Sequence, residues 1–376
     1  MNKLVSLIAQ FTFLLLFLRG ILGNYDVKTI YLTIFINVLL MYLIFSVRFS
    51  GRLLIILAWG FLAVFHNKDA LALIDLALFT YVLQYDRLSK YINWGYICYA
   101  GSFIAILSLL QMNIIHNEEI QYVHKGKVIA NSMGMGSSNM TGGNPNLAGQ
   151  FFYLLFMFSF LRYTGRKYAS DIWLAIAISL LSYIAFEFTQ ARAAFYSALI
   201  LSIFVIFMPI IRRFKLINKI CLSLAPSVLA IVSLYISLNQ NSFYELDKLA
   251  TDRVSNPAFI IAKMETIDWL IGTNIPDDMA MDSSYLTILF EGGVPAFLLI
   301  FCILVVRIWR NYDTIIKWEP MIVSVLAYGC LENIFSSFNC LSVIFFTFII
   351  CSNNKYHCYG RKQSKNLCAN IVHESA

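Results

Sequence analysis

Four cationic side chains lie beside apolar segments, where they could hold a phosphate or diphosphate group. Arg192 separates two apolar runs and precedes two alanines, so a bulky anion could approach its guanidinium. The planar fork of an arginine suits bidentate contact with phosphate oxygens. The alternative is an interfacial arginine that extends its head group to water and orients its helix. The other three cations, for which solvated loop charges are the alternative, are Lys248, Arg253 and Lys263.

Asp282 is the candidate proton acceptor. It ends a polar segment in which Asp277 and Asp278 compete for the same role, and two serines follow it before the next apolar run. A carboxylate at a membrane surface could take a proton from a hydroxyl. Asp and Ser also cap helices by accepting hydrogen bonds from free N–H groups, which explains these residues equally simply.

Four further carboxylates lie inside apolar runs or near their ends. Ionisable groups in such places are costly in lipid and usually face a bundle interior or a cavity. A structural hydrogen-bond network, a proton relay and a contact with substrate all remain open for them. These residues are Asp75, Glu187, Glu291 and Glu332.

The composition decides what kind of protein must position these groups. The 376 residues are 59% hydrophobic and only 13% charged, with a mean hydropathy of +0.71. Soluble domains carry roughly 25% charged residues, so a polytopic membrane protein is expected instead of a cytosolic or secreted enzyme. The net charge of +7 does not form a basic stripe with exposed aromatics, so no nucleic-acid partner is predicted. The cysteines and histidines show neither CxxC nor HExxH spacing, and neither a metal nor a cofactor is predicted.

Twelve apolar runs predict roughly 10–12 transmembrane helices in a single domain, residues 1–351. The first run is expected to be a retained helix, and two of the runs are short enough to be re-entrant or tilted. The runs lie near 4–22, 29–47, 53–65, 70–85, 92–112, 148–161, 171–188, 193–211, 217–238, 285–306, 319–334 and 338–351.

Basic residues orient the predicted helices. With the N-terminus inside, every inner connection carries Lys or Arg, which places both termini and a basic tail, 352–376, in the cytoplasm. Two long segments, about 113–147 and 239–284, then face outward. Long loops are often functional. In the second, residues 257–271 show helical amphipathic spacing and are expected to lie on the outer membrane surface.

Three local segments resemble the O-antigen polymerase and O-antigen ligase superfamily of bacterial surface-polysaccharide assembly. No string is specific alone, but their order and common membrane side make the set informative over about 140–295. They are Thr141–Ala148 with its Asn-Pro-Asn sequence, Thr189–Ala194 around an arginine, and the series Arg253, Trp269–Gly272, Asp282–Leu286 and Glu291–Gly293.

The resemblance implies a membrane glycosyltransferase of the GT-C type at the outer face of the bacterial inner membrane. Donor and acceptor would be oligosaccharides on undecaprenyl diphosphate, with a chain-length regulator left open as a partner. The implied catalytic residues are Arg192, Arg253 and Asp282, and the predicted substrate contacts are Asn144, Asn146, Glu187, Lys248, Lys263 and Tyr285.

The sequence departs from the ligase pattern. Ligases of this superfamily usually carry a His-Asn pair where Asp282 and Ser283 stand, and this region contains no histidine. The difference favours a polymerase for lipopolysaccharide biosynthesis. A ligase that transfers the glycan to lipid A core and a flippase for lipid-linked oligosaccharides remain the alternatives.

Overall fold

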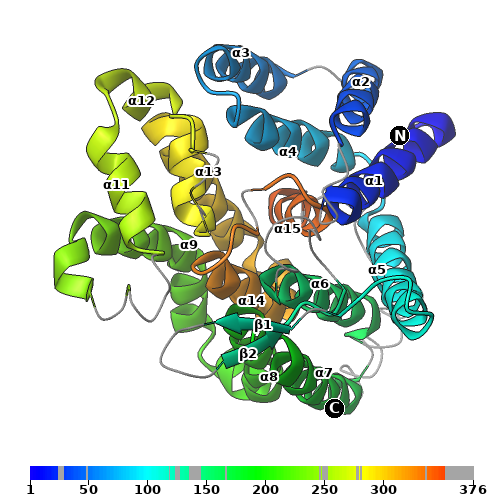
Figure 1. Cartoon of the computed structure of the whole chain (residues 1–376). Coiled ribbons are helices and arrows are strands. Elements are labelled where there is room, and N and C mark those ends of the chain that lie inside the picture. The colour runs from blue at the N-terminus through cyan, green and yellow to red at the C-terminus, as the bar shows by residue number, and fades with distance from the viewer. Residues whose placement is uncertain are drawn as a thin grey trace.

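Each of the twelve predicted apolar runs forms a helix in the computed structural model (Figure 1). In a bilayer, a helix satisfies its backbone hydrogen bonds internally, which is why long apolar runs adopt this form. The structure describes residues 1–23, 29–47, 50–117, 119–122, 128–134, 145–165, 167–244, 247, 253–276, 279, 282–334 and 337–351. The helices are α1 (Lys3–Gly23), α2 (Ile30–Ser46), α3 (Gly51–His66), α4 (Ala70–Leu83), α5 (Leu88–Gln111), α6 (Pro145–Tyr163), α7 (Tyr168–Thr189), α8 (Arg192–Arg213), α9 (Lys215–Leu238), α13 (Ser284–Ile315), α14 (Glu319–Gly329) and α15 (Cys340–Cys351).

Six helical segments of the described chain are long and apolar enough to cross a membrane. Large apolar side chains on these helices are exposed, including Leu7 at 64%, Ile104 at 65% and Trp173 at 71%. Such side chains suit contact with lipid. The predicted helical chain is therefore confirmed, and six of its helices could span a membrane, whereas the sequence predicted roughly 10–12 spans. The six are Lys3–Gly23, Leu88–Gln111, Tyr168–Thr189, Arg192–Arg213, Lys215–Leu238 and Ser284–Gly329, the last including α14.

Two strands interrupt the all-helical prediction. β1 (Glu119–Tyr122) pairs antiparallel with β2 (Val128–Asn131), in the register Glu119↔Asn131 to Tyr122↔Val128. They lie in the long segment 113–147. Four-residue strands are too short to produce a clear alternating pattern, so the sequence gives little signal for them.

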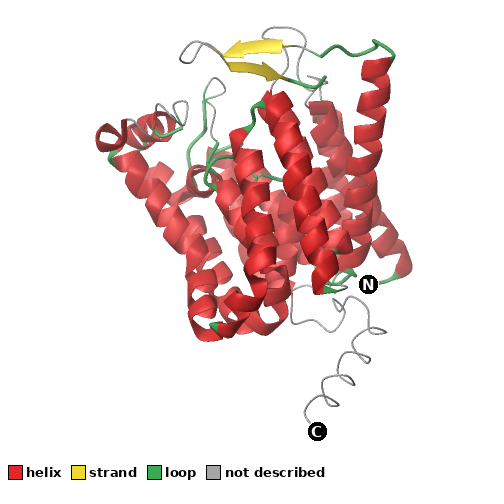
Figure 2. Cartoon of the chain, turned by 90° about the horizontal axis from the view of Figure 1, so that it is seen from below, coloured by secondary structure: helices red, strands yellow, loops and turns green. Residues whose placement is uncertain are grey.

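The bundle has two distinct ends. Figure 2 shows the β1–β2 pair at one end, here called the hairpin end, and the N-terminus at the other, the basic end. The chain rises through α5 to the hairpin and descends through α6, so α8 begins at the hairpin end and finishes at the basic end. An ion pair of 2.6 Å between Lys215 Nζ and Asp313 Oδ1 brings the last turns of α13 to the basic end as well. Cations cluster there as predicted, at Arg87, Lys90, Arg162, Lys167, Arg212, Arg213 and Lys215.

The second long segment folds into short helices at the hairpin end. They are a 3-10 turn η1 (Gln240–Phe243), α11 (Ser255–Lys263) and α12 (Thr266–Ile271). The sequence predicted one amphipathic stretch over 257–271, but Met264 takes an extended ψ of 126° and ends α11. Glu265 and Asp268 then form a capping box that starts α12. The break lets the two helices follow different directions over the bundle (Figure 1).

Candidate functional site

Arg253 joins two carboxylates at the hairpin end. Its Nε lies 2.9 Å from Asp282 Oδ2, and its Nη2 lies 2.8 Å from Glu332 Oε1. Its Nη1 donates to the carbonyl of Leu331. The three charged side chains are mostly buried, with exposed fractions of 16% for Arg253, 24% for Asp282 and 15% for Glu332. We call these three residues the Arg253 cluster.

Three separate segments position the cluster. Arg253 immediately precedes α11, whose first N–H groups are bound by Asp247: its Oδ1 accepts from Val254 N at 2.8 Å. Asp282 precedes α13. Ser284, in the first turn of α13, donates to the carbonyl of Glu332 at 2.9 Å and accepts from Ile334 N at 2.8 Å. These bonds fix the loop after α14 against the start of α13, so both carboxylates face the guanidinium.

The cluster carries one more negative than positive charge when all three groups are ionised. Burial raises the pKa of Glu332 to about 7, with Arg253 opposing and Asp282 reinforcing the rise. Burial likewise raises the pKa of Asp282, against the pull of Arg253. Burial lowers and the two carboxylates raise the pKa of Arg253, and the net shift is upward. Glu332 can therefore bind and release a proton near neutral pH, because its pKa lies there, and this suits general acid–base chemistry.

Ser283 lies beside the cluster with an unsatisfied hydroxyl. It is 7% exposed, and its Oγ has no hydrogen-bond partner among the described residues. A buried hydroxyl without a partner costs roughly 1–3 kcal/mol, so a polar ligand at this place would recover that loss.

Arg192 stands at the same end of the bundle but apart from the cluster. It is the first residue of α8, is exposed, and makes no ion pair within the described part of the chain. Farther along α8, the carbonyl of Ser197 accepts from Ser324 of α14 at 2.7 Å. α14 runs from the basic end to the hairpin end, so Glu332, which follows α14, lies at the hairpin end. Arg192, at the start of α8, lies at the same end. Arg192 thus keeps its guanidinium available, whereas Arg253 is already paired.

Small residues bring α6 against the start of α8. A Cβ on Gly149 would lie 2.1 Å from the Cβ of Ala191 and 3.5 Å from that of Ala194. The two helices can approach this closely only because Gly149 lacks a side chain. One turn later, the Tyr153 hydroxyl donates to Ser324 Oγ at 2.9 Å, since the Ser324 proton is given to the Ser197 carbonyl. The ring centroids of Tyr153 and Tyr328 lie 4.2 Å apart. The alanines around Arg192 therefore serve helix packing, in addition to any role in ligand access.

The other predicted substrate contacts are scattered. Tyr285 is fully buried and donates to the carbonyl of Leu326 at 2.9 Å, so its place in the core gives it a packing role instead of the predicted contact with substrate. Lys263 is exposed and sits 3.7 Å above the ring of Phe259. Glu187 is exposed near the end of α7, and Asn146 is exposed in the first turn of α6. Asn144 and Lys248, and the competing Asp277 and Asp278, lie outside the described residues.

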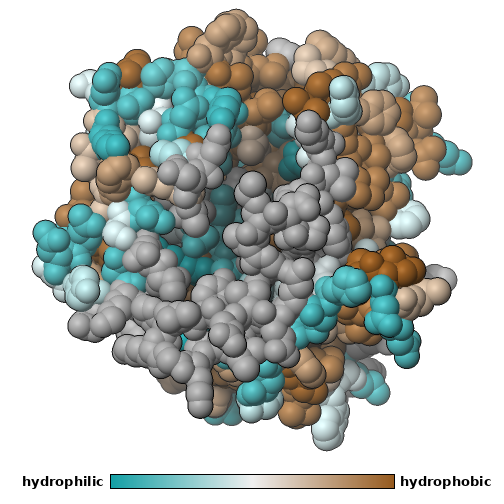
Figure 3. Space-filling view, in the orientation of Figure 1, coloured by the Kyte–Doolittle hydropathy of each residue, from teal (hydrophilic) through white to brown (hydrophobic). Residues whose placement is uncertain are grey.

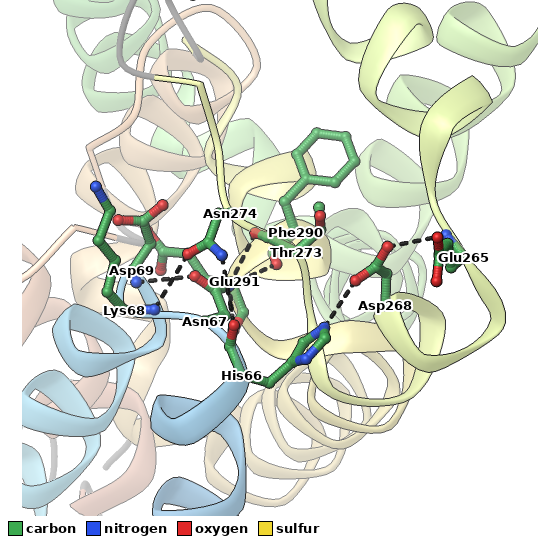
Figure 4. A network of polar contacts seen from close by, with 10 residues as sticks. All are labelled: His66, Asn67, Lys68, Asp69, Glu265, Asp268, Thr273, Asn274, Phe290 and Glu291. Atoms are coloured by element: carbon green, nitrogen blue, oxygen red, sulfur yellow. Dashed lines mark hydrogen bonds and ion pairs between the residues drawn. The ribbon is translucent and has the colours of Figure 1, made fainter.

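A second polar network braces the long segment against the bundle (Figure 4). Asn67 Nδ2, at the turn between α3 and α4, donates to the carbonyls of Thr273 at 2.8 Å and Phe290 at 3.1 Å. The ring of His66 lies 2.8 Å from Asp268. The carbonyl of Phe290 also accepts from Thr273 N at 2.6 Å. The turn after α12 is thereby bound to both α3 and α13.

Two glycines make this contact possible. Gly272 has φ/ψ of 92°/171° and Gly293 has 68°/178°, a region open essentially to glycine alone. A Cβ on Gly272 would lie 2.5 Å from the Phe290 oxygen, and one on Gly293 would lie 2.6 Å from the Leu270 carbonyl. The Trp269–Gly272 turn and the Glu291–Gly293 kink, noted separately in the sequence, are thus two halves of one contact.

A cleft of about 450 Å³ opens beside this brace. Figure 3 looks onto the hairpin end and shows hydrophilic residues in a hollow near its middle, with apolar residues along much of the outer edge. The cleft combines charges of both signs with an apolar wall. Its lining is Arg19, Thr33, Lys68, Asp69, Leu71, Ala72, Asp75, Ile275, Pro276, Met279 and Glu291.

The sequence pointed to most of these groups singly but did not join them. Glu332 was noted as an acid at the end of an apolar run, without a link to Arg253, although their common outer side was a usable signal. Arg19, which lines the cleft, was not among the residues singled out in the sequence. No group of three or more His, Cys, Asp or Glu in the described residues is placed to hold a metal ion. No protein-family model, curated protein or solved structure matches the chain.

Proposed function

We propose that this protein is a membrane glycosyltransferase of the GT-C type that polymerises oligosaccharide repeat units carried on undecaprenyl diphosphate. The observation that carries the proposal is the Arg253 cluster, a buried carboxylate pair held by a guanidinium at the end of an apolar helix bundle. Transfer between two lipid-anchored substrates needs such a proton acceptor where their polar parts emerge from the membrane.

The proposed step is a displacement at the anomeric carbon of the donor. A hydroxyl of the acceptor attacks that carbon, and the bond from the carbon to the diphosphate oxygen breaks. The bonding electrons leave with the diphosphate, and the hydroxyl proton passes to the carboxylate pair. A Glu332 pKa of about 7 makes this residue a better proton acceptor than an ordinary carboxylate. In a single displacement the anomeric configuration inverts.

Arg192 is the proposed contact for the departing diphosphate. Negative charge grows on this group in the transition state, so a preorganised cation lowers the barrier. The sequence suggested both arginines for this task. Arg253 already neutralises Asp282 and Glu332, and it serves the reaction better by orienting them. Arg192 is exposed at the same end, and its guanidinium forms no ion pair among the described residues, so its N–H groups can make a bidentate contact with a phosphate.

The proposed setting is the bacterial inner membrane, with the hairpin end toward the outer side and the basic end in the cytoplasm. The cations gathered at the basic end support this orientation, since Lys and Arg are enriched in cytoplasmic connections. The proposed partners are the lipid bilayer and the lipid-linked donor and acceptor, with a chain-length regulator as a further partner. The product would enter lipopolysaccharide or another surface polysaccharide.

The test combines deletion and reconstitution. A strain lacking the protein should display one repeat unit on its lipid A core, while the purified protein in nanodiscs should convert lipid-linked repeat units into a ladder of lengths. Loss of all repeat units from the core, with one capped product in vitro, would assign a ligase. Absence of any new glycosidic bond would reject the enzyme.

The charged cleft among apolar helices favours one second candidate, a flippase for lipid-linked oligosaccharides. Asp75 and Glu291, 4% and 6% exposed, are the kind of intramembrane carboxylates that line transport pathways. Vesicles that move the lipid-linked unit between leaflets without lengthening it would establish this alternative.

A further inference from the structure

We infer that the cleft beside α4 and α13 binds a sugar residue of the lipid-linked substrate through hydroxyl hydrogen bonds to Glu291 and its charged neighbours. This inference rests on the proposed function and adds a second subsite to it, distinct from the Arg253 cluster. A cleft of about 450 Å³ falls within the usual range for small-molecule sites.

Glu291 supplies the observation that points to a ligand. Its side chain lines the cleft and is 6% exposed, yet Oε2 has no hydrogen-bond partner among the described residues. A buried carboxyl oxygen without a partner costs free energy in either protonation state, and a hydroxyl can both donate to it and accept from it. Its backbone is meanwhile fixed by the kink at Gly293 and by Asn67, so the side chain cannot relax away freely.

The neighbouring charges are held in place for recognition. Arg19 donates from Nη2 to the carbonyl of Phe338 at 2.7 Å and lies 5.2 Å from that residue's ring centroid. Asp75 accepts from the amide nitrogen of Asn37 at 2.8 and 2.9 Å, in the amide orientation that satisfies both groups. The cleft thus contains both donors and acceptors, and the hydroxyl groups of a sugar can use both.

The charge balance argues for a sugar instead of a bare ion. The lining contains two cations, Arg19 and Lys68, and three acids, Asp69, Asp75 and Glu291. A diphosphate would meet the acids, and a metal ion would meet the cations. A neutral, hydroxyl-rich group can use both kinds of side chain, while Leu71 and Ala72 offer an apolar wall to its ring face.

The cleft lies within reach of the Arg253 cluster. Met279 lines the cleft, and Asp282 is three residues later in the same segment. Three residues span at most about 11 Å at ~3.6 Å each, so one oligosaccharide can contact both places. The cleft would then hold a sugar next to the one whose hydroxyl reacts.

The experiment compares two probes on the full protein in nanodiscs. One is the lipid-linked repeat unit that accumulates in the deletion strain, and the other is undecaprenyl diphosphate alone. Wild-type protein should bind the first more tightly. Glu291→Gln should weaken the affinity for the lipid-linked repeat unit about tenfold, as expected for the loss of one strong hydrogen bond. The same variant should leave the affinity for undecaprenyl diphosphate unchanged. The control Asp313→Asn, on the same helix but 78% exposed at the basic end, should change neither affinity.

Ala72→Trp provides a second variant that fills the cleft without removing a polar group, and it should also weaken binding of the lipid-linked unit alone. Unchanged affinities in both variants would overturn the inference, even if the wild type makes polymer. If the cleft bound sodium ions, and the two probes bound equally well, the inference would also be overturned. Sugar-dependent binding without polymer would keep this site and reject the proposed function.

Discussion

Glu332 Oε1 accepts a hydrogen bond of 2.8 Å from Arg253 Nη2, although 79 residues separate the two positions. The contact links the segment before α11 to the loop after α14. Asp282, at the start of α13, completes the group from a third segment. A pair of mostly buried acids therefore depends on one cation, and each member can be removed separately to learn what it contributes.

Replacement of Arg253 should destabilise the fold as well as abolish activity. Arg253→Met leaves two acids facing each other in a poorly solvated site, and loss of one partner of a buried pair costs about 3–5 kcal/mol. Thermal unfolding in detergent should show a clear fall in the transition temperature. Lys263→Met, which removes an exposed cation from the neighbouring helix α11, should leave the transition almost unchanged. Equal effects of the two substitutions would contradict the buried pairing.

Glu332 should make the folded protein less stable as the pH rises from 4.5 toward 7, the opposite of the effect of an ordinary ion-paired carboxylate. Its pKa is raised from 4.5 to about 7, so between these values the folded protein binds more protons than the unfolded chain. The free energy of unfolding then falls as the pH rises through this window, by ~1.36 kcal/mol for each unit of the shift. Unfolding curves from pH 4.5 to 8 should show the decline, and Glu332→Gln should flatten it. A wild-type profile that rises with pH over this window would contradict the assignment.

Features of the fold that follow from local sequence patterns could be predicted, whereas contacts between residues far apart in the chain could not. The twelve helices were predictable because each follows from a local apolar run, and the basic end followed from the charges between runs. The break at Met264 and the short strands were missed because their signals extend over only a few residues. The pairing of Arg253 with Glu332 was missed because it joins distant loops, and no local pattern records which loops meet.

The same limit applies to the cleft and to Tyr285. The cleft takes its lining from several helices and from the 275–279 segment, so it exists only after packing. Tyr285 was predicted to contact substrate, but the helix that begins at Ser284 turns its side chain into the core. Gly272 and Gly293 are the instructive case, because the sequence marked both positions without showing that the turn at one packs against the kink at the other.

Arg192 should be required for the reaction and dispensable for folding. Its side chain is exposed, so Arg192→Ala should change the free energy of unfolding by no more than about 0.5 kcal/mol. If its planar fork holds the departing diphosphate, Arg192→Ala should abolish polymer, and Arg192→Lys should recover only a small part of the activity. Polymer length distributions on gels measure the effect. Wild-type ladders from the alanine variant would remove Arg192 from the mechanism, and full activity of the lysine variant would reduce its role to simple charge.

Gly272 should tolerate no side chain, both because its φ is positive and because a Cβ would collide with the Phe290 oxygen. Gly165 has the first of these features without the second, so it serves as the control. Gly272→Ala would meet the strain of a positive φ and would place a Cβ 2.5 Å from the Phe290 oxygen. Gly165 also has a positive φ, of 84°, but a Cβ there would meet nothing within 4 Å. Gly165→Ala should therefore cost only the backbone term, about 1–2 kcal/mol. Gly272→Ala should cost clearly more and should release the α12 turn from α13, which faster hydrogen exchange at Thr273 N would report. Similar losses for both variants would mean that the close contact between the turn and the kink contributes little.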